Sequence, residues 1–182
     1  MEIRQTLAGL TLALILGSGV AAAADFDKGF KAYESLDFKT ALAEFTPLAD
    51  QGHADAQYHL GLMYDDGFFD VVLRNYKTAL KWFTKAAEQG HLDAQVSLAY
   101  RYYLDNDKAA LKWFTKAAGQ GHPDAQYNLG LMYLDGTGVL ENYRTAVKWL
   151  SEAAKQGHAE AQHYLAIMCA DGTGVFKDNV KA

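Results

Sequence analysis

The sequence predicts an all-α fold, an α-solenoid of stacked antiparallel helix hairpins, and two observations lead to this prediction. The first is an internal repeat, because short motifs return along the chain in the same order and register. The second is helical spacing of apolar residues within each repeat. A single hairpin of this size cannot bury its apolar face alone, so neighbouring hairpins must stack. The repeat is clearest in Gln-Gly-His, which Ala-Gln follows at a fixed offset and which occurs at 51–53, 89–91, 120–122 and 156–158.

Each repeat is expected to hold two helices. One face of the first helix carries small and apolar residues at helical spacing, in the first full repeat Ala56, Leu60, Gly61 and Tyr64. The second helix carries a comparable stripe, formed by Leu80, Phe83, Ala86 and Ala87. Small residues are expected where two helix backbones approach closely, as at Gly61. Gly90 follows the second helix and suits a left-handed C-terminal cap, which a side chain would strain.

The repeats differ mainly in the loop between their helices. The first full repeat has a long apolar loop, and we expect its Phe68 and Phe69 side chains to be exposed candidates for binding. In the second, residues 104–108 shorten the loop. The units expected from these patterns are a leading hairpin, three full repeats and an incomplete repeat, at 26–52, 53–90, 91–121, 122–157 and 158–182. Self-association through the incomplete C-terminal repeat is left open.

Residues 1–24 are predicted to be a signal peptide. An apolar stretch from Leu7 to Val20 follows Arg4, and three alanines at 22–24 offer a small-residue cleavage site. The stretch is shorter than the roughly 20 residues of a spanning helix, which makes a membrane anchor the weaker alternative. The mature protein is therefore expected in the periplasm or outside the cell, with no membrane span after cleavage.

Composition limits the partners and the chemistry. The net charge is −5 and no cluster of Lys or Arg stands out, so nucleic acid is not an expected partner. The single cysteine, Cys169, cannot form an intramolecular disulfide, and we expect it to be a small buried apolar residue. No cofactor is implied.

The pattern Ala-x-Ala-Gln-x-x-Leu-Gly-x-Met-Tyr, then Asp-Gly-x-Gly-Val, then Ala-x-x-Trp-x-x-x-Ala-Ala-x-x-Gly resembles the Sel1-like repeat, a relative of the tetratricopeptide repeat. The matching first helices begin near Ala54, Leu92, Pro123 and Ala159. The resemblance implies an adaptor that holds partner proteins. It carries no general set of catalytic residues that maps onto this chain, so an enzyme is not expected.

By resemblance to tetratricopeptide proteins, the second, fifth, ninth and twelfth residues of each first helix should face the inner surface of the superhelix. They are Asp55, Tyr58, Leu62 and Asp65; Asp93, Val96, Tyr100 and Tyr103; Asp124, Tyr127, Leu131 and Leu134; and Glu160, His163, Ile167 and Ala170. Tyrosine suits such a surface because it offers a large contact area at low entropic cost. The acids favour a partner with basic features. The alternative is that several of these residues pack against the neighbouring repeat.

Two other recurring features have structural explanations. His53, His91, His122 and His158 occupy equivalent positions, too far apart for one zinc ion to bridge, so a role at the start of the first helix is favoured over metal binding. The Gly-Thr-Gly loops lack the Lys-Ser/Thr of a phosphate-binding loop. The function predicted from the sequence is an exported protein-binding adaptor, with binding of a glycan or peptidoglycan fragment on the same surface as the alternative.

Overall fold

The computed structural model describes residues 24–68, 71–103, 105–170 and 172, and within them the chain forms nine α-helices and no strand. Each helix packs chiefly against the helix before it and the helix after it. The predicted all-α solenoid is confirmed. In chain order the helices are α1 (Phe26–Glu34), α2 (Phe38–Asp50), α3 (Ala54–Asp66), α4 (Tyr76–Glu88), α5 (Leu92–Tyr102), α6 (Asp107–Gly119), α7 (Pro123–Asp135), α8 (Tyr143–Lys155) and α9 (Ala159–Ala170).

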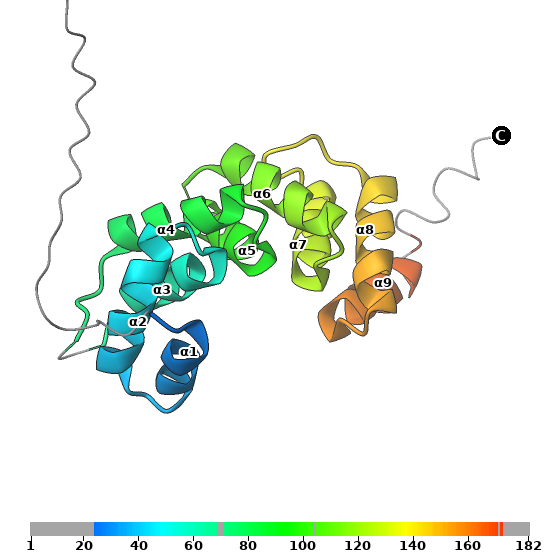
Figure 1. Cartoon of the computed structure of the whole chain (residues 1–182). Helices are drawn as coiled ribbons and strands as arrows, with labels where there is room; N and C mark the ends of the chain where they lie inside the picture. The colour runs from blue at the N-terminus through cyan, green and yellow to red at the C-terminus, as the bar shows by residue number, and fades with distance from the viewer. Residues whose placement is uncertain (1–23, 69–70, 104, 171, 173–182) are drawn as a thin grey trace, which may run out of the picture.

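The hairpins follow one another along a curved row. Figure 1 shows α5 and α7, the first helices of two successive repeats, along the inner side of this curve, with α4 and α6 along the outer side. Contacts that lie chiefly between consecutive helices are what a solenoid predicts, because each repeat touches only its neighbours.

The core lies between the two helices of each hairpin, where a large side chain of the second helix meets a small residue of the first. A Cβ atom on Gly61 would lie 2.5 Å from the ring of Phe83, and one on Gly130 would lie 2.7 Å from Cγ of Leu150. The expectation of small residues at close helix contacts is therefore confirmed at Gly61. Phe83, Phe114 and Leu150 are all fully buried at this interface.

Local chemistry sets where the helices begin and end. Each second helix of the full repeats starts after an asparagine whose side chain accepts a hydrogen bond from a backbone N–H of the first turn, at Asn75, Asn106 and Asn142. Gly90 has φ +95°, as expected of a left-handed position just beyond a helix.

One sequence expectation about the core is wrong, and others fall outside the described residues. Cys169 is exposed on α9, because the buried positions of this helix are Ala161 and Met168. Phe69, residues 1–23 and residues 173–182 lie outside the described part of the chain, so the predictions made for them stay predictions. No described helix is long and apolar enough to cross a bilayer.

His59 is enclosed by aromatic rings at the junction of the leading hairpin and the first full repeat. Its ring centroid lies 5.1–5.9 Å from those of Phe45, Tyr33, Phe30, Tyr58 and Phe26. Its Nδ1 atom is buried and has no hydrogen-bond partner among the described residues. Burial lowers the pKa of His59, and the nearby His91 acts in the same direction, whereas Asp55 and Asp93 oppose the shift.

The lowered pKa predicts that the fold loses stability in mild acid. Below the unfolded-state pKa of about 6.5, the unfolded chain binds a proton at His59 that the folded chain resists, so the free energy of unfolding falls as the pH drops through this range. Urea unfolding between pH 7.5 and 5.5 should show this loss. His59→Asn introduces the residue that the third full repeat has at this position, Asn128. In this variant the free energy of unfolding should depend less on pH. The same pH dependence in both proteins would contradict the role assigned to His59.

Candidate functional site

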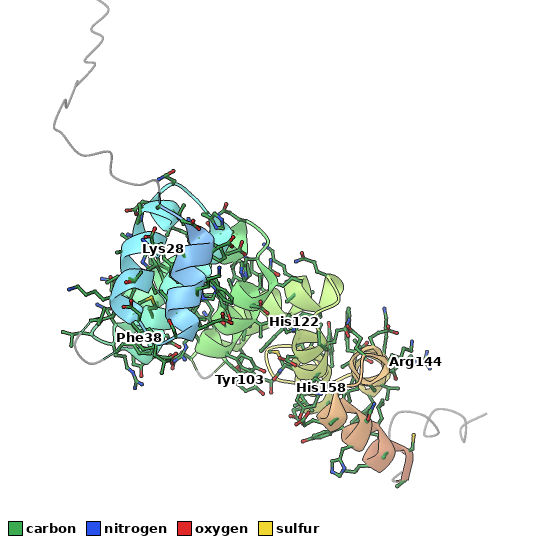
Figure 2. All side chains as sticks on the ribbon, turned by 60° about the horizontal axis from the view of Figure 1, so that its bottom comes forward. Lys28, Phe38, Tyr103, His122, Arg144 and His158 are labelled. Carbon is green, nitrogen blue, oxygen red and sulfur yellow. The ribbon has the colours of Figure 1, made fainter. Side chains whose placement is uncertain are left out.

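The repeated histidine joins successive repeats. Nδ1 of His91 accepts a hydrogen bond from the backbone N–H of Ala94 at 3.2 Å, and His53 and His158 cap α3 and α9 in the same way. In a neutral imidazole this bond leaves the proton on Nε2. Nε2 of the histidine faces a carboxylate of the preceding repeat; the pairs are His91–Asp55 at 3.2 Å, His122–Asp93 at 3.2 Å and His158–Asp124 at 3.3 Å. Figure 2 labels His122 and His158, which lie in successive repeats.

These pairs change the interpretation of the inner-surface acids. Asp55, Asp93 and Asp124 were predicted to face a partner and to favour basic features in it. Each instead pairs with a histidine of its own chain. All three aspartate side chains nevertheless stay more than half exposed, so they link adjacent repeats and the expected preference for a basic partner stays a prediction.

The repeated glutamines form a second link, which the sequence analysis missed. Each first-helix glutamine donates its side-chain amide to the backbone carbonyl eight residues earlier at 2.9–3.3 Å; the pairs are Gln57–Ala49, Gln95–Ala87, Gln126–Ala118 and Gln162–Ala154. The glutamine of the following Gln-Gly-His donates its side-chain amide to the side-chain oxygen of this first-helix glutamine at 2.7–3.0 Å; the pairs are Gln89–Gln57, Gln120–Gln95 and Gln156–Gln126. The fixed offset of the two glutamines in every repeat was the available signal.

The fifth residues of the first helices pack between repeats. The Tyr58 ring lies 4.5 Å from that of His91, and the Tyr127 ring lies 4.6 Å from that of His158, measured between centroids. Val96 is only 6% exposed, so its predicted place on a binding surface is wrong. These three residues therefore pack against the neighbouring repeat, which was the alternative considered from the sequence. His163 on α9 is exposed.

Three of the four twelfth residues are also largely enclosed, and Ala170 is exposed. Asp65 is 9% exposed and forms an ion pair with Arg101 of the next repeat, which corrects its predicted place on the inner surface. Burial raises the pKa of the Asp65 carboxyl, although the Arg101 guanidinium opposes this shift. Tyr103 and Leu134 are half-buried against the core.

Phe68 is half-buried, contrary to the expected exposure. Its ring stacks on that of Phe38, the first residue of α2, with 3.4 Å between centroids. The loop folds back on itself, because the backbone N–H groups of Phe68 and Val72 each donate to the carbonyl of the other. Phe69, the other predicted loop residue, lies outside the described residues.

The ninth residues of the first helices contribute most of the predicted aromatic and apolar surface that remains exposed. Tyr100 is 48% exposed, and its hydroxyl accepts a hydrogen bond of 2.7 Å from Nδ2 of Asn128 in the next repeat. Burial of part of the ring raises the pKa of Tyr100, so the hydroxyl stays neutral. Leu62 and Leu131 are half-buried and Ile167 is exposed. We call the set Tyr100, Asn128, Leu131, His163 and Ile167 the inner surface; Asn128 was not singled out from the sequence.

An open groove of about 680 Å³ lies beside Tyr100, between the start of α4 and the end of α5. It is the α4–α5 groove, lined chiefly by Tyr76, Lys77, Leu80, Tyr100, Arg101 and Tyr102. Phenol rings, an aliphatic side chain and two cations give it the mixed character of a site that binds side chains of another molecule.

Comparison with known proteins identifies the repeat. The model of the Sel1 repeat family matches four consecutive segments, which together span well over half of the chain: 54–91, 92–122, 123–158 and 159–182.

The chain belongs to the Sel1 repeat family.

Two solved structures of Sel1 repeat type are similar to it. A Sel1 repeat protein from Oxalobacter formigenes is 31% identical, with a TM-score of 0.79, over 84% of this chain and 64% of that one. The protein c5321, described as a protective antigen present in uropathogenic Escherichia coli strains displaying an SLR fold, is 37% identical, with a TM-score of 0.75, over 82% of this chain and 34% of that one. The chain thus spans less than two thirds of the length of each. No curated protein matches the sequence significantly.

Membership in this family bears on function in a general way. Sel1 repeat proteins generally mediate protein–protein interaction, and the repeat fold is typically a non-enzymatic scaffold. Protein partners are therefore the class that this Sel1 repeat chain suggests.

Proposed function

We propose that this Sel1 repeat protein is an exported adaptor that holds a segment of a partner protein on its inner surface. The observation that carries the proposal is the pair Tyr100–Asn128. A half-exposed tyrosine of one repeat is held by the asparagine of the next, so one rigid contact area extends over α5 and α7. Tyrosine in such a place is typical of binding hot spots.

Burial elsewhere supports this location. Of the residues expected on the inner surface, Tyr58, Val96 and Tyr127 are used between repeats. Tyr100, His163 and Ile167 are exposed and Leu131 is half-buried, and they come from three successive first helices. A partner segment that lies across these helices would contact several repeats at once, which is how a solenoid gains contact area.

The proposed location in the cell rests on the leader. Residues 1–24 have the charged start, apolar stretch and small-residue end of a secretory signal. We propose that the mature chain acts in the periplasm or outside the cell. Amino-terminal sequencing of the protein from cell fractions would test this, and an intact Met1 in a cytoplasmic fraction would contradict it.

The adaptor role is tested by photo-crosslinking in cells. With the probe at Tyr100 or at Leu131, we expect a discrete heavier band whose second component is one protein, identified by mass spectrometry. The expected efficiency is highest at Tyr100, because its side chain is the more exposed of the two.

The matched control carries the probe at Thr115, an exposed residue of α6. Helix α6 lies along the outer side of the curve (Figure 1). Crosslinks of equal strength from Thr115 would indicate unspecific contact. If neither inner-surface position gives a protein adduct in cells that hold the folded protein, protein binding on this surface is ruled out.

A further inference from the structure

The loop of a repeat normally covers the start of the preceding second helix. In the first full repeat, Phe68 of the loop stacks on Phe38, the first residue of α2. In the third, a Cβ atom on Gly138 of the loop would lie 2.8 Å from the backbone oxygen of Asp107, the first residue of α6. Both loops therefore fill the same place, between the start of one second helix and the end of the next first helix.

The loop of the second repeat is too short to match them. It has four residues (103–106), against nine (67–75) and seven (136–142) in the other two. The residue in the place of Phe38 and Asp107 is Tyr76, which begins α4 and is 53% exposed. The α4–α5 groove lies here, between the start of one second helix and the end of the next first helix, as Phe68 does one repeat earlier.

A second departure from the repeat coincides with the short loop. At the tenth position of the first helix the other repeats bury a methionine, at Met63, Met132 and Met168. The second repeat has Arg101 there, and its guanidinium carbon lies 5.4 Å from the centroid of the Tyr76 ring while it pairs with Asp65. Arg101 is exposed at this position, whereas the methionines of the other repeats are buried.

The charges around the groove favour an acidic ligand. Two cations, Lys77 and Arg101, line the groove together with one acid, Asp105. Arg101 also pairs with the buried Asp65, but 45% of its side chain stays exposed. This positive excess stands in a chain whose net charge is −5. Lys77 is exposed at the edge, where a carboxylate can reach it.

We propose that the α4–α5 groove binds an aromatic side chain of the partner protein, followed in its sequence by an acidic residue. The aromatic ring of the partner packs against Tyr76 in the way that the Phe68 ring packs against Phe38. The carboxylate beside it pairs with Lys77 and the exposed edge of Arg101. This inference rests on the proposed adaptor function, and it adds the chemistry of the partner segment.

The test uses three synthetic peptides and the isotope-labelled full chain. The core of the first peptide is Ser-Phe-Asp-Ser, the second has Ala in place of Phe, and the third has Lys in place of Asp. NMR titration should show the first peptide shifting resonances of Tyr76, Lys77 and Tyr102. The other two should bind about tenfold more weakly, because each lacks one of the two interactions.

Two variants keep the test sharp. Lys77→Glu changes an exposed residue and should reverse the preference, so that the Phe-Lys peptide binds better than the Phe-Asp peptide. Arg101→Met places in the second repeat the methionine that the other three repeats have at this position, and it should reduce binding of the Phe-Asp peptide. If Arg101→Met does not fold, the result for Lys77→Glu decides the test. Equal affinity for all three peptides, shifts outside the groove, or no shifts at all would overturn the inference. A photo-crosslink at Leu131 without one at Lys77 would overturn it while leaving the adaptor function standing.

Discussion

Phe114→Ala is expected to lower the free energy of unfolding by about 3–5 kcal/mol. Phe114 is completely buried in the central hydrophobic cluster, between the first helices of the second and third repeats. Its removal leaves a cavity that rigid neighbouring helices cannot close. Urea denaturation followed by circular dichroism at 222 nm measures the loss.

A graded variant checks that the loss comes from the cavity. The third repeat has Leu150 at the equivalent position, also fully buried, so Phe114→Leu inserts a residue that the fold already accepts there. We expect a smaller loss of about 1–2 kcal/mol, since less volume is removed. Equal losses for the two variants would show that cavity volume does not set the stability of this interface.

Gln95→Leu is expected to cost about 1–3 kcal/mol, because it removes two side-chain hydrogen bonds at a buried position. The Gln95 amide donates to the carbonyl of Ala87 at 3.2 Å, and its oxygen accepts from Gln120 at 3.0 Å. Gln95 is almost fully buried, so water cannot replace the lost bonds, and the similar volume of leucine leaves no large cavity. The same urea denaturation measures this loss.

The fold offers its own control for this change. Gln162 makes the equivalent bond, to Ala154 at 3.1 Å, but its side chain is exposed on α9. Gln162→Leu should therefore change the free energy of unfolding by less than about 0.5 kcal/mol, since water solvates the carbonyl that it releases. A cost as large as that of Gln95→Leu would mean that the bond matters by its position in the repeat and not by its burial.

The two central variants also report on cooperation between repeats. In a solenoid, stability is a sum over repeats and the interfaces between neighbours. Phe114 and Gln95 both lie in the second full repeat, which links the leading half of the chain to the third repeat and α9. A loss of stability here should separate the unfolding of the two ends, and a broader transition in Phe114→Ala would reveal it.

The candidate site was predicted only in part, and particular residues show why. Tyr100 was expected on the inner surface and is half-exposed there. Tyr58 and Tyr127 occupy one position of the repeat, and both are taken up by the histidine of the following repeat. The sequence ranked the fifth and ninth positions of the first helix equally, because the difference between them arises from what the adjacent repeat places against each side chain.

The loops gave the opposite lesson. Phe68 was expected to be exposed because it lies in a long loop between helices, yet its ring stacks on that of Phe38, thirty residues earlier. The short loop of the second repeat was visible in the sequence, but its consequence was not. The groove at Tyr76 exists because a neighbouring segment is missing from a place that only the packing of α4 on α5 defines.

The sequence by itself determined the helical repeat, the small residues at close helix contacts and the glycine after the second helix, as at Gly61 and Gly90. These features depend on backbone conformation and on helical spacing within one hairpin, both of which are local. The tertiary structure decided which residues of the repeated pattern remain available to a partner. Tyr100 and Val96 lie in the same helix, and only the stacking of the neighbouring helices leaves the first exposed and buries the second.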